Sequence, residues 1–266
     1  MSHPRRISTM AAALLAALVS ILALTGGAAQ AQTIEYVALG DSYASGVGTR
    51  SYLDDGSGCS RSASAYPSLI ANEIGADLTF AACSGAKTGD VLSKQLGGLS
   101  GSTDLVTITI GGNDTGWASV VQQCAYPYPW TCDSQIKTAE AFIRDQLPAK
   151  LHAVYDAIEA AAPNAEVIVL GYPLLFNGEE CNAITRISPG EQSKLNAAAD
   201  LLGDTIGTVA GSHDFQYVDV RDAFDDHAVC DDTEWVNGLS YPIAESYHPN
   251  TAGQKNGYFP LLNALV

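Results

Sequence analysis

Ser42 has the sequence context of a catalytic nucleophile. It lies in the motif Gly40-Asp41-Ser42-Tyr43, directly after an apolar run at residues 36–39. We therefore expect its hydroxyl where a buried strand ends and a helix begins. The unpaired N–H groups of a helix start suit a reaction that develops an oxyanion. The alternative is a serine that only caps the helix, which is a common structural role.

Three later residues have the types needed to complete such a site. Gly85 lies in a loop after the second expected strand, where a glycine can present its N–H to a ligand or simply form a turn. Asn113 follows the third expected strand, and its amide can donate to an oxyanion or serve in an ordinary turn. His248 precedes Pro249, which favours extended backbone, and an imidazole is the usual base for activating a serine.

The other histidines that follow residue 31 are weaker candidates. His152 lies within a helical pattern, and His213 and His227 lie in polar loops, so we expect solvated or structural roles for them. A metal site is also disfavoured, because the sequence contains no Cys-x-x-Cys or His-x-x-x-His spacing. We therefore expect no metal.

Residues 1–31 predict a secretory signal peptide. They contain the basic pair Arg5-Arg6, an apolar stretch at 11–24 and the small-residue motif Ala29-Gln30-Ala31, after which we expect cleavage. The alternative is a membrane anchor, but the stretch is shorter than the about 20 apolar residues that span a bilayer. We therefore expect a secreted protein whose single domain covers residues 32–266.

The acidic composition limits the partners. The chain has 13 Lys and Arg against 29 Asp and Glu, a formal net charge of −16. Such a charge repels nucleic acid and anionic membrane surfaces, so we expect no nucleic-acid partner and no stable membrane insertion. We also expect a monomer. A nucleotide enzyme is disfavoured because no phosphate-cradling glycine motif is present. The common α/β-hydrolase type is disfavoured because no serine has Gly both two residues before and two residues after it.

The cysteines predict a disulfide framework. An even number of six in an exported chain indicates three disulfides, and six cysteines allow 15 pairings. Among these pairings we favour the sequential one, Cys59–Cys83, Cys124–Cys132 and Cys181–Cys230.

Alternating strand and helix patterns predict the fold class. Strand-like apolar runs recur at residues 36–39, 78–81, 105–110, 167–170 and 215–220. Helical stretches lie between them, and the third and fourth runs are apolar enough to be buried on both faces, as in a parallel sheet. We therefore predict an α/β protein, a three-layer α/β/α sandwich with a mostly parallel five-stranded sheet of the doubly wound, flavodoxin-like kind.

Local signals predict three helix boundaries. Pro148 predicts a kink or break near Gln146, or at the residue after it, in the helical stretch 139–161. The segment Ser188-Pro189-Gly190-Glu191 is a capping box with Pro at the first helical position, so a helix should start there. Asn250 or the residue after it is expected to cap a short C-terminal helix.

These motifs, in this order, resemble those of the GDSL-type or SGNH hydrolases, and most of all their secreted actinobacterial lipase and esterase branch. The resemblance covers almost all of the chain after the leader. It includes the number of cysteines and the motifs at 36–43, Gly111-Gly112-Asn113-Asp114, Gly171-Tyr172-Pro173 and Ser246-Tyr247-His248-Pro249.

The resemblance implies roles for individual residues. Ser42 would be the nucleophile, and its own N–H would be the first oxyanion donor. The N–H of Gly85 and the side-chain amide of Asn113 would complete the oxyanion hole. His248 would act as general base and then as general acid. The resemblance also implies the SGNH-hydrolase form of the three-layer fold, the sequential disulfides and the absence of a cofactor.

The chain departs from the family pattern at two positions. Tyr43 stands where the family has Leu, and similar secreted lipases carry an aromatic residue there. Glu245 stands three residues before His248, where the family usually has the Asp that orients the imidazole. The Glu245 side chain is one methylene longer than Asp. It is one candidate for this orienting role, and a backbone carbonyl, of Glu245 or Ser246, is the other.

The expected reaction is the hydrolysis of carboxylic esters through an acyl-enzyme on Ser42, with His248 as base. The resemblance favours fatty-acyl esters, namely glycerides, phospholipids or lysophospholipids. Residues 172–176 could line an acyl groove, or could be packing residues. Short-chain or carbohydrate acetyl esters are the alternative substrates, and a non-catalytic secreted binding protein is the alternative class.

Overall fold

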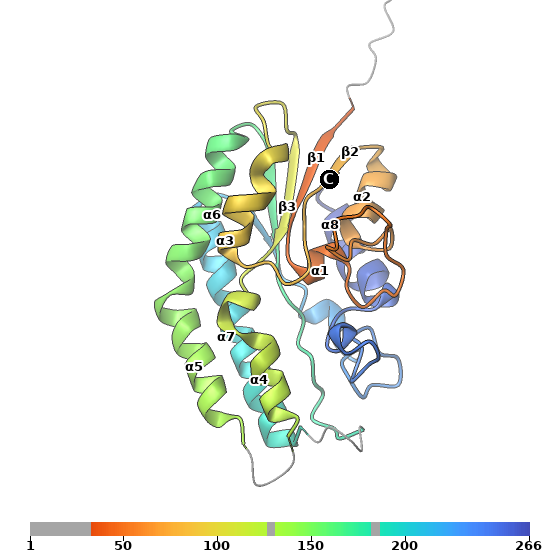
Figure 1. Ribbon diagram of the computed structural model, residues 1–266, viewed down its shortest axis with the longest axis vertical. Coiled ribbons are helices and arrows are strands. Elements are labelled where there is room, and N and C mark those ends of the chain that lie inside the picture. Colours follow the sequence, from red (N-terminus) through yellow and green to blue (C-terminus); the bar gives the residue numbers. More distant parts are fainter. Residues whose placement is uncertain (1–32, 127–130, 182–186) are drawn as a thin grey trace, which may run out of the picture. The chain divides into compact units, whose positions relative to one another are not determined.

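A five-stranded parallel sheet forms the centre of the fold (Figure 1). The computed structural model describes residues 33–126, 131–181 and 187–266, and the signal peptide predicted over 1–31 lies outside them. The sheet order is β2-β1-β3-β4-β5, and every pair of neighbouring strands is parallel. The strands are β1 (Glu35–Gly40), β2 (Asp77–Phe80), β3 (Leu105–Thr109), β4 (Glu166–Leu170) and β5 (Gln216–Val218).

Helices cover both faces of this sheet, which confirms the predicted α/β/α sandwich. Figure 1 shows α3 to α7 on one side of the sheet and α1, α2 and α8 on the other. The α-helices are α1 (Ser42–Ser45), α2 (Tyr66–Ile74), α3 (Thr88–Asp90), α4 (Trp117–Cys124), α5 (Asp133–Asp145), α6 (Leu147–Ala161), α7 (Pro189–Ser212) and α8 (Phe259–Asn263). Shorter π and 3₁₀ turns are η1 (Val91–Gln95), η2 (Leu96–Gly98), η3 (Asn113–Thr115), η4 (Asp222–Phe224), η5 (Ile243–Glu245) and η6 (Gly253–Tyr258).

Burial follows the position of each strand in the sheet. Every residue of β3 is buried, and so is every residue of β1 after Glu35, because these strands have neighbours on both sides. The edge strand β2 instead alternates exposed and half-buried residues. The run predicted at 215–220 forms only the three residues of β5, since its pairing with β4 stops at the pair Leu170–Val218.

The local helix signals are confirmed. Helices α5 and α6 are separated at Gln146, two residues before Pro148. Helix α5 starts at Asp133, earlier than the predicted start at residue 139. Helix α7 starts with the capping box, in which the Ser188 N–H donates to Glu191 Oε2 at 3.1 Å. At the C-terminal helix, Asn250 Oδ1 accepts the N–H groups of the two residues at 252 and 253.

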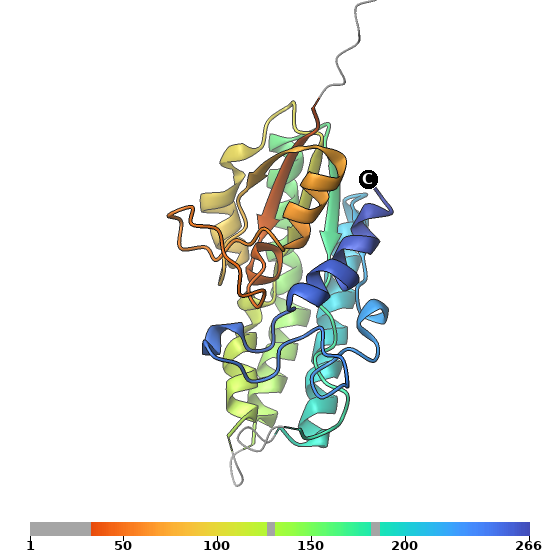
Figure 2. The ribbon, with the colours of Figure 1, turned by 90° about the vertical axis from the view of Figure 1, so that its right-hand side faces the viewer.

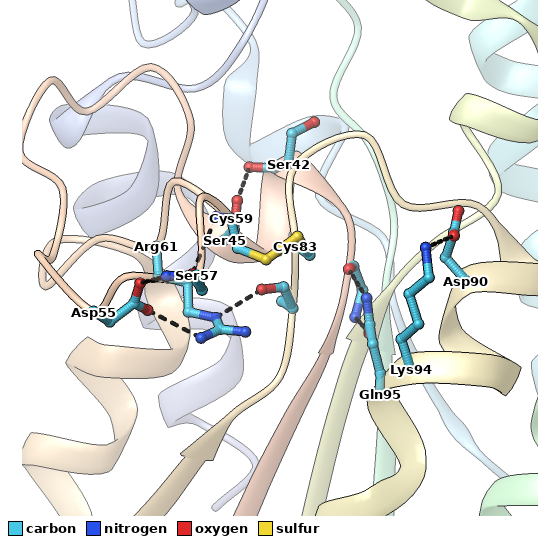
Figure 3. The surroundings of a disulfide bond; sticks show 12 residues. Ser42, Ser45, Asp55, Ser57, Cys59, Arg61, Cys83, Asp90, Lys94 and Gln95 are labelled. Atoms are coloured by element: carbon cyan, nitrogen blue, oxygen red, sulfur yellow. Dashed lines mark hydrogen bonds and ion pairs between the residues drawn. A yellow bond between two sulfur atoms is a disulfide. The ribbon is translucent and has the colours of Figure 1, made fainter.

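Three disulfides fasten the loops that connect these elements. They are Cys59–Cys83, Cys124–Cys132 and Cys181–Cys230, which is the sequential pairing that we favoured. The first joins the long loop after α1 to the loop after β2, as Figure 3 shows.

The ends of the central strands meet at one edge of the sheet. The Asp41 N–H, just after β1, donates to the carbonyl of Thr109 at the end of β3, with a distance of 2.9 Å. The Cys83 N–H, in the loop after β2, donates to the Gly40 carbonyl at the end of β1, with a distance of 3.0 Å. The residues that follow β1, β2 and β3 are therefore neighbours at the carboxyl edge, where parallel sheets carry their sites.

Candidate active site

A hydrogen bond joins Ser42 to His248. The Ser42 Oγ lies 2.8 Å from His248 Nε2, and the other ring nitrogen, Nδ1, lies 2.9 Å from the carbonyl oxygen of Ser246. Because a carbonyl oxygen can only accept, Nδ1 carries the proton and Nε2 accepts from the Ser42 hydroxyl. Burial lowers the pKa of His248 to about 4, although the bond to Ser246 acts in the opposite direction. The imidazole is therefore neutral at neutral pH and ready to take a proton.

Of the two candidates that the sequence left open for orienting His248, the Glu245 side chain is bound elsewhere. The buried carboxylate of Glu245 accepts from the Tyr52 hydroxyl at 2.8 Å and from Arg50 Nε at 3.0 Å. The carbonyl of Ser246, the alternative that the sequence left open, occupies the position on Nδ1 instead. Glu245 therefore fastens its own loop to the loop that carries Arg50 and Tyr52.

Ser42 lies at the start of a single helical turn. The preceding Asp41 has extended backbone, and its Oδ1 accepts the N–H of Tyr43 at 2.9 Å. The N–H of Ser42 belongs to the first turn, where an α-helix offers it no internal partner. At Gly40, φ is +123° and an added Cβ would lie 2.4 Å from the carbonyl oxygen of Thr109, so this approach of β1 to β3 requires glycine.

The Asn113 amide is held in place with one hydrogen to spare. Its Nδ2 donates to the carbonyl of Ala86 at 3.0 Å, and an amide nitrogen carries two hydrogens. This bond brings the loop after β2 next to the turn after β3. Gly85 precedes Ala86 in that loop and has φ +78°, a left-handed backbone that suits glycine.

The loop that carries Gly85 is braced on both sides. The disulfide Cys59–Cys83 holds its start, and Arg61 Nε donates to the Ala82 carbonyl at 2.9 Å (Figure 3). Beyond the glycine, Asp114 accepts from the Thr88 N–H at 2.9 Å and from the Thr88 hydroxyl at 2.6 Å. Asp114 thus has a structural role, because it fixes this loop to the turn after β3.

A buried tyrosine links the turn after β1 to the turn after β3, which sequence reasoning did not find. The Tyr172 hydroxyl donates to Asp41 Oδ2 at 2.6 Å and accepts the N–H of Gly112 at 3.1 Å. Burial raises the pKa of Asp41 to about 7, against the lowering effect of the Tyr172 hydroxyl. Tyr43 connects the turn after β1 to the segment that carries His248, because its hydroxyl donates to the Tyr247 carbonyl at 2.7 Å. The only sequence signal for this link was the Gly-Tyr-Pro motif within the family resemblance.

Ser42, Asn113 and His248 line a cavity of about 600 Å³. Its other walls are largely apolar and come from α4, α7 and the segments around residues 172–175 and 239–247. They include Trp117, Val121, Leu175, Leu202, Leu239 and Ile243. Of the predicted groove residues 172–176, three line the cavity, while positions 174 and 176 do not. Gly85 is likewise not among the lining residues found in the described part of the chain.

The three weaker histidine candidates lie away from the cavity walls. His213 contacts His152 through a 2.8 Å bond and Glu159 through a 3.1 Å bond, so it ties α6 to the end of α7. Three side chains here could offer ligand atoms to a metal ion, and these atoms lie within 4.8 Å of one another: Asp156, Glu159 and His213. Both carboxylates are exposed, however, and His213 already has partners on both ring nitrogens. His227 stacks on Trp235 with ring centroids 3.6 Å apart.

This parallel fold, with its serine–imidazole pair at the wall of an apolar cavity, defines a carboxylic ester hydrolase. More narrowly, the chain belongs to the GDSL-like lipase/acylhydrolase family, whose model matches residues 38–255.

Known relatives cover nearly the whole chain. Lipase 1 of Streptomyces coelicolor is 45% identical over 253 residues, which is 92% of this chain and 93% of that protein. The solved extracellular lipase of Streptomyces rimosus is 42% identical, with a TM-score of 0.84, covering 88% of this chain and 100% of that one. The solved phospholipase A1 of Streptomyces albidoflavus is also 42% identical, with a TM-score of 0.83 and the same coverage. Among the described residues, we find no helix with the length and apolar character needed to cross a bilayer.

Proposed function

We propose that Ser42 and His248 hydrolyse fatty-acyl carboxylic esters through an acyl-enzyme. The observation that carries this proposal is the 2.8 Å bond from Ser42 Oγ to His248 Nε2 at the wall of a large apolar cavity. As Ser42 Oγ attacks the ester carbonyl, His248 takes its proton and then gives it to the leaving alcohol. His248 next removes a proton from water as the water attacks the acyl-enzyme, and it returns this proton to Ser42 Oγ as the acid leaves.

The oxyanion of each tetrahedral intermediate would be held by three donors. These are the N–H of Ser42 at the start of α1, the N–H of Gly85 and the second hydrogen of Asn113 Nδ2. Their loops are fixed before substrate arrives, by a disulfide and by the bond to the Ala86 carbonyl. A pre-positioned donor of this kind lowers the barrier by about 3 kcal/mol. The Ser246 carbonyl would keep the imidazole in the reactive tautomer and stabilise its protonated form.

The cavity favours fatty-acyl esters over acetyl esters. Its volume of about 600 Å³ and its largely apolar walls offer far more contact than an acetyl group can use. Burial of each additional methylene contributes about 0.8 kcal/mol, so long chains gain binding energy there. The names of the relatives, lipase and phospholipase A1, point to glycerides or phospholipids as the esters.

The protein would act outside the cell as a single domain over residues 32–266. Three disulfides favour an oxidising compartment, and one solved relative is an extracellular lipase. Export would use the leader at residues 1–31. The substrate is the only partner that this activity requires.

Replacement of the nucleophile gives the first test. Ser42→Ala should abolish turnover and leave the circular dichroism and melting temperature close to those of the parent. Ser45→Ala in the same helical turn is the matched control and should stay active, since its hydroxyl makes only a 3.4 Å contact to the Ser42 carbonyl. An alkyl phosphonate should label the parent once per chain, at Ser42. A protein that takes up no label would favour a non-catalytic binding protein instead. A Ser42→Ala variant that still turns over would refute Ser42 as the nucleophile.

A series of p-nitrophenyl esters tests the acyl preference. From acetate to longer chains, kcat/KM should rise, because each methylene enters the apolar cavity. A sharp maximum at acetate would contradict the fatty-acyl proposal and support an acetyl esterase.

A further inference from the structure

Two loops beside the cavity carry four exposed large apolar side chains, two of which are the most exposed of this kind among the described residues. In the loop at 239–247, Tyr241 is 91% exposed and Ile243 is 69% exposed. In the loop at 50–53, Tyr52 and Leu53 are 40% and 43% exposed. We call these four residues the rim surface.

The two loops are joined to each other. Tyr52 donates to Glu245 Oε1, and Arg50 donates to Glu245 Oε2 and to the hydroxyl of Ser240. Residues 50–53 and 240–245 therefore lie side by side although almost 190 residues separate them in the sequence. Figure 2 shows these two loops next to each other on one side of the molecule.

The rim surface is continuous with the proposed acyl cavity. Ile243 and its neighbour Ala244 line that cavity, and Ile243 is at the same time largely exposed, so it marks the opening. On the α4 side Tyr126 has the same two properties, since it lines the cavity and is 49% exposed. Apolar side chains thus extend from the cavity wall to the outer surface.

Scattered exposed apolar residues are normal on soluble proteins, whereas apolar residues gathered at a ligand opening mark an interaction site. Tyrosine in particular suits a boundary between hydrocarbon and water, because its ring is apolar and its hydroxyl is polar. The esters proposed for this cavity are carried in lipid aggregates. An enzyme that rests on the aggregate can receive an acyl chain without first moving it through water.

We propose that the rim surface docks the protein on the surface of uncharged or zwitterionic lipid aggregates, with the cavity opening toward the lipid. This inference rests on the proposed function and adds where the substrate comes from. Docking is driven by apolar contact rather than by charge. The net charge of −16 opposes binding to anionic surfaces, so added anionic lipid should weaken it.

Vesicle binding tests the proposal without interference from hydrolysis. The full chain, expressed with its own leader, carries Ser42→Ala and is sedimented with phosphatidylcholine vesicles. Tyr241→Ser with Leu53→Ser is the test variant, since neither residue lines the cavity. Each replacement should weaken binding about tenfold, and the pair about a hundredfold. Leu92→Ser is the matched control, because Leu92 is 40% exposed and lies on η1, on the face of the sheet that carries α6.

The same substitutions in the active protein, which retains Ser42, separate docking from catalysis. Hydrolysis of dissolved p-nitrophenyl butyrate should be unchanged by Tyr241→Ser and Leu53→Ser, while hydrolysis of vesicle lipid should fall. Equal vesicle binding by the test variant and its parent would overturn the proposal, and so would an equal loss in Leu92→Ser. The alternative is that the rim surface binds a second copy of the chain, which sedimentation velocity tests. A parent dimer that becomes monomeric in the test variant, with vesicle binding unchanged, would assign the surface to that second copy.

The failure of docking and the failure of the proposed function give different results. A protein that hydrolyses dissolved esters but does not bind vesicles would overturn only the docking proposal. A protein that hydrolyses no dissolved ester would overturn the proposed function, and its vesicle binding would still be measured separately in the Ser42→Ala chain.

Discussion

Tyr172→Phe removes a single oxygen atom from the centre of the site. That oxygen donates to Asp41 at 2.6 Å and accepts the Gly112 N–H at 3.1 Å, in buried surroundings. Loss of a hydrogen bond to a carboxylate costs about 2 kcal/mol, and a buried N–H left without a partner costs about as much again. We therefore expect the free energy of unfolding to fall by about 4 kcal/mol.

The same substitution should also weaken stabilisation of the transition state of ester hydrolysis. Gly112 directly precedes Asn113, whose amide is a proposed oxyanion donor worth about 3 kcal/mol when it is well placed. A loosened turn should forfeit about half of that, which lowers kcat about tenfold. KM should change little, because the phenyl ring still fills its place in the cavity wall and the ground-state contacts remain.

The assay measures kcat and KM on dissolved p-nitrophenyl butyrate together with urea unfolding. Tyr36→Phe is the control, because its buried hydroxyl also makes a 2.6 Å bond, to Thr107 Oγ1, but within the sheet. That variant should lose stability and keep its kcat. If Tyr172→Phe also kept its kcat while losing stability, the hydroxyl would be structural only and the reasoning about the linked turns would be refuted.

Three further predictions follow from the geometry of the site. Asn113→Ala should lower kcat about a hundredfold with little change in KM, because the amide contact strengthens in the transition state; an effect confined to KM in steady-state kinetics would contradict the oxyanion role. Glu245→Gln should keep kcat within about threefold of the parent, since the Ser246 carbonyl holds His248; a loss as large as that of Ser42→Ala would restore the carboxylate as orienter. The acid limb of kcat/KM should have its midpoint near pH 4, because the neutral form of His248 accepts the proton and burial lowers its pKa to about 4. A pH–rate profile on protein still folded by circular dichroism checks this, and a midpoint near the ordinary value of about 6.5 would disprove it.

Local sequence signals were sufficient for several elements of the fold, though not for the start of α5 or the length of β5. The β-branched run at 105–110 fixed β3, Pro148 predicted the separation of α5 from α6, and the capping box at 188–191 placed the start of α7. Each of these signals acts over a few residues, where backbone sterics and N–H partners decide the outcome. The parallel order of strands then brought Ser42 and the turn of Asn113 to one edge without further information.

The remaining contacts depend on residues far apart in the sequence. Whether the Glu245 side chain or a carbonyl faces His248 was decided by Arg50 and Tyr52, which bind that carboxylate across more than 190 positions. The bond from Tyr172 to Asp41 likewise spans 131 positions. No local sequence pattern predicts such a pair, because the contact places no requirement on the residues next to either partner in the chain.

The partner of the imidazole on the side away from Ser42 is a main-chain atom, and this affects how the site can vary in evolution. A peptide carbonyl is present whatever side chain stands at position 246, so point substitutions there need not abolish the relay. On the proposed mechanism, position 245 need not carry an acid for catalysis, and here its carboxylate secures a loop. Motif searches that require an aspartate three residues before the histidine would therefore overlook enzymes built in this way, although their relay is complete.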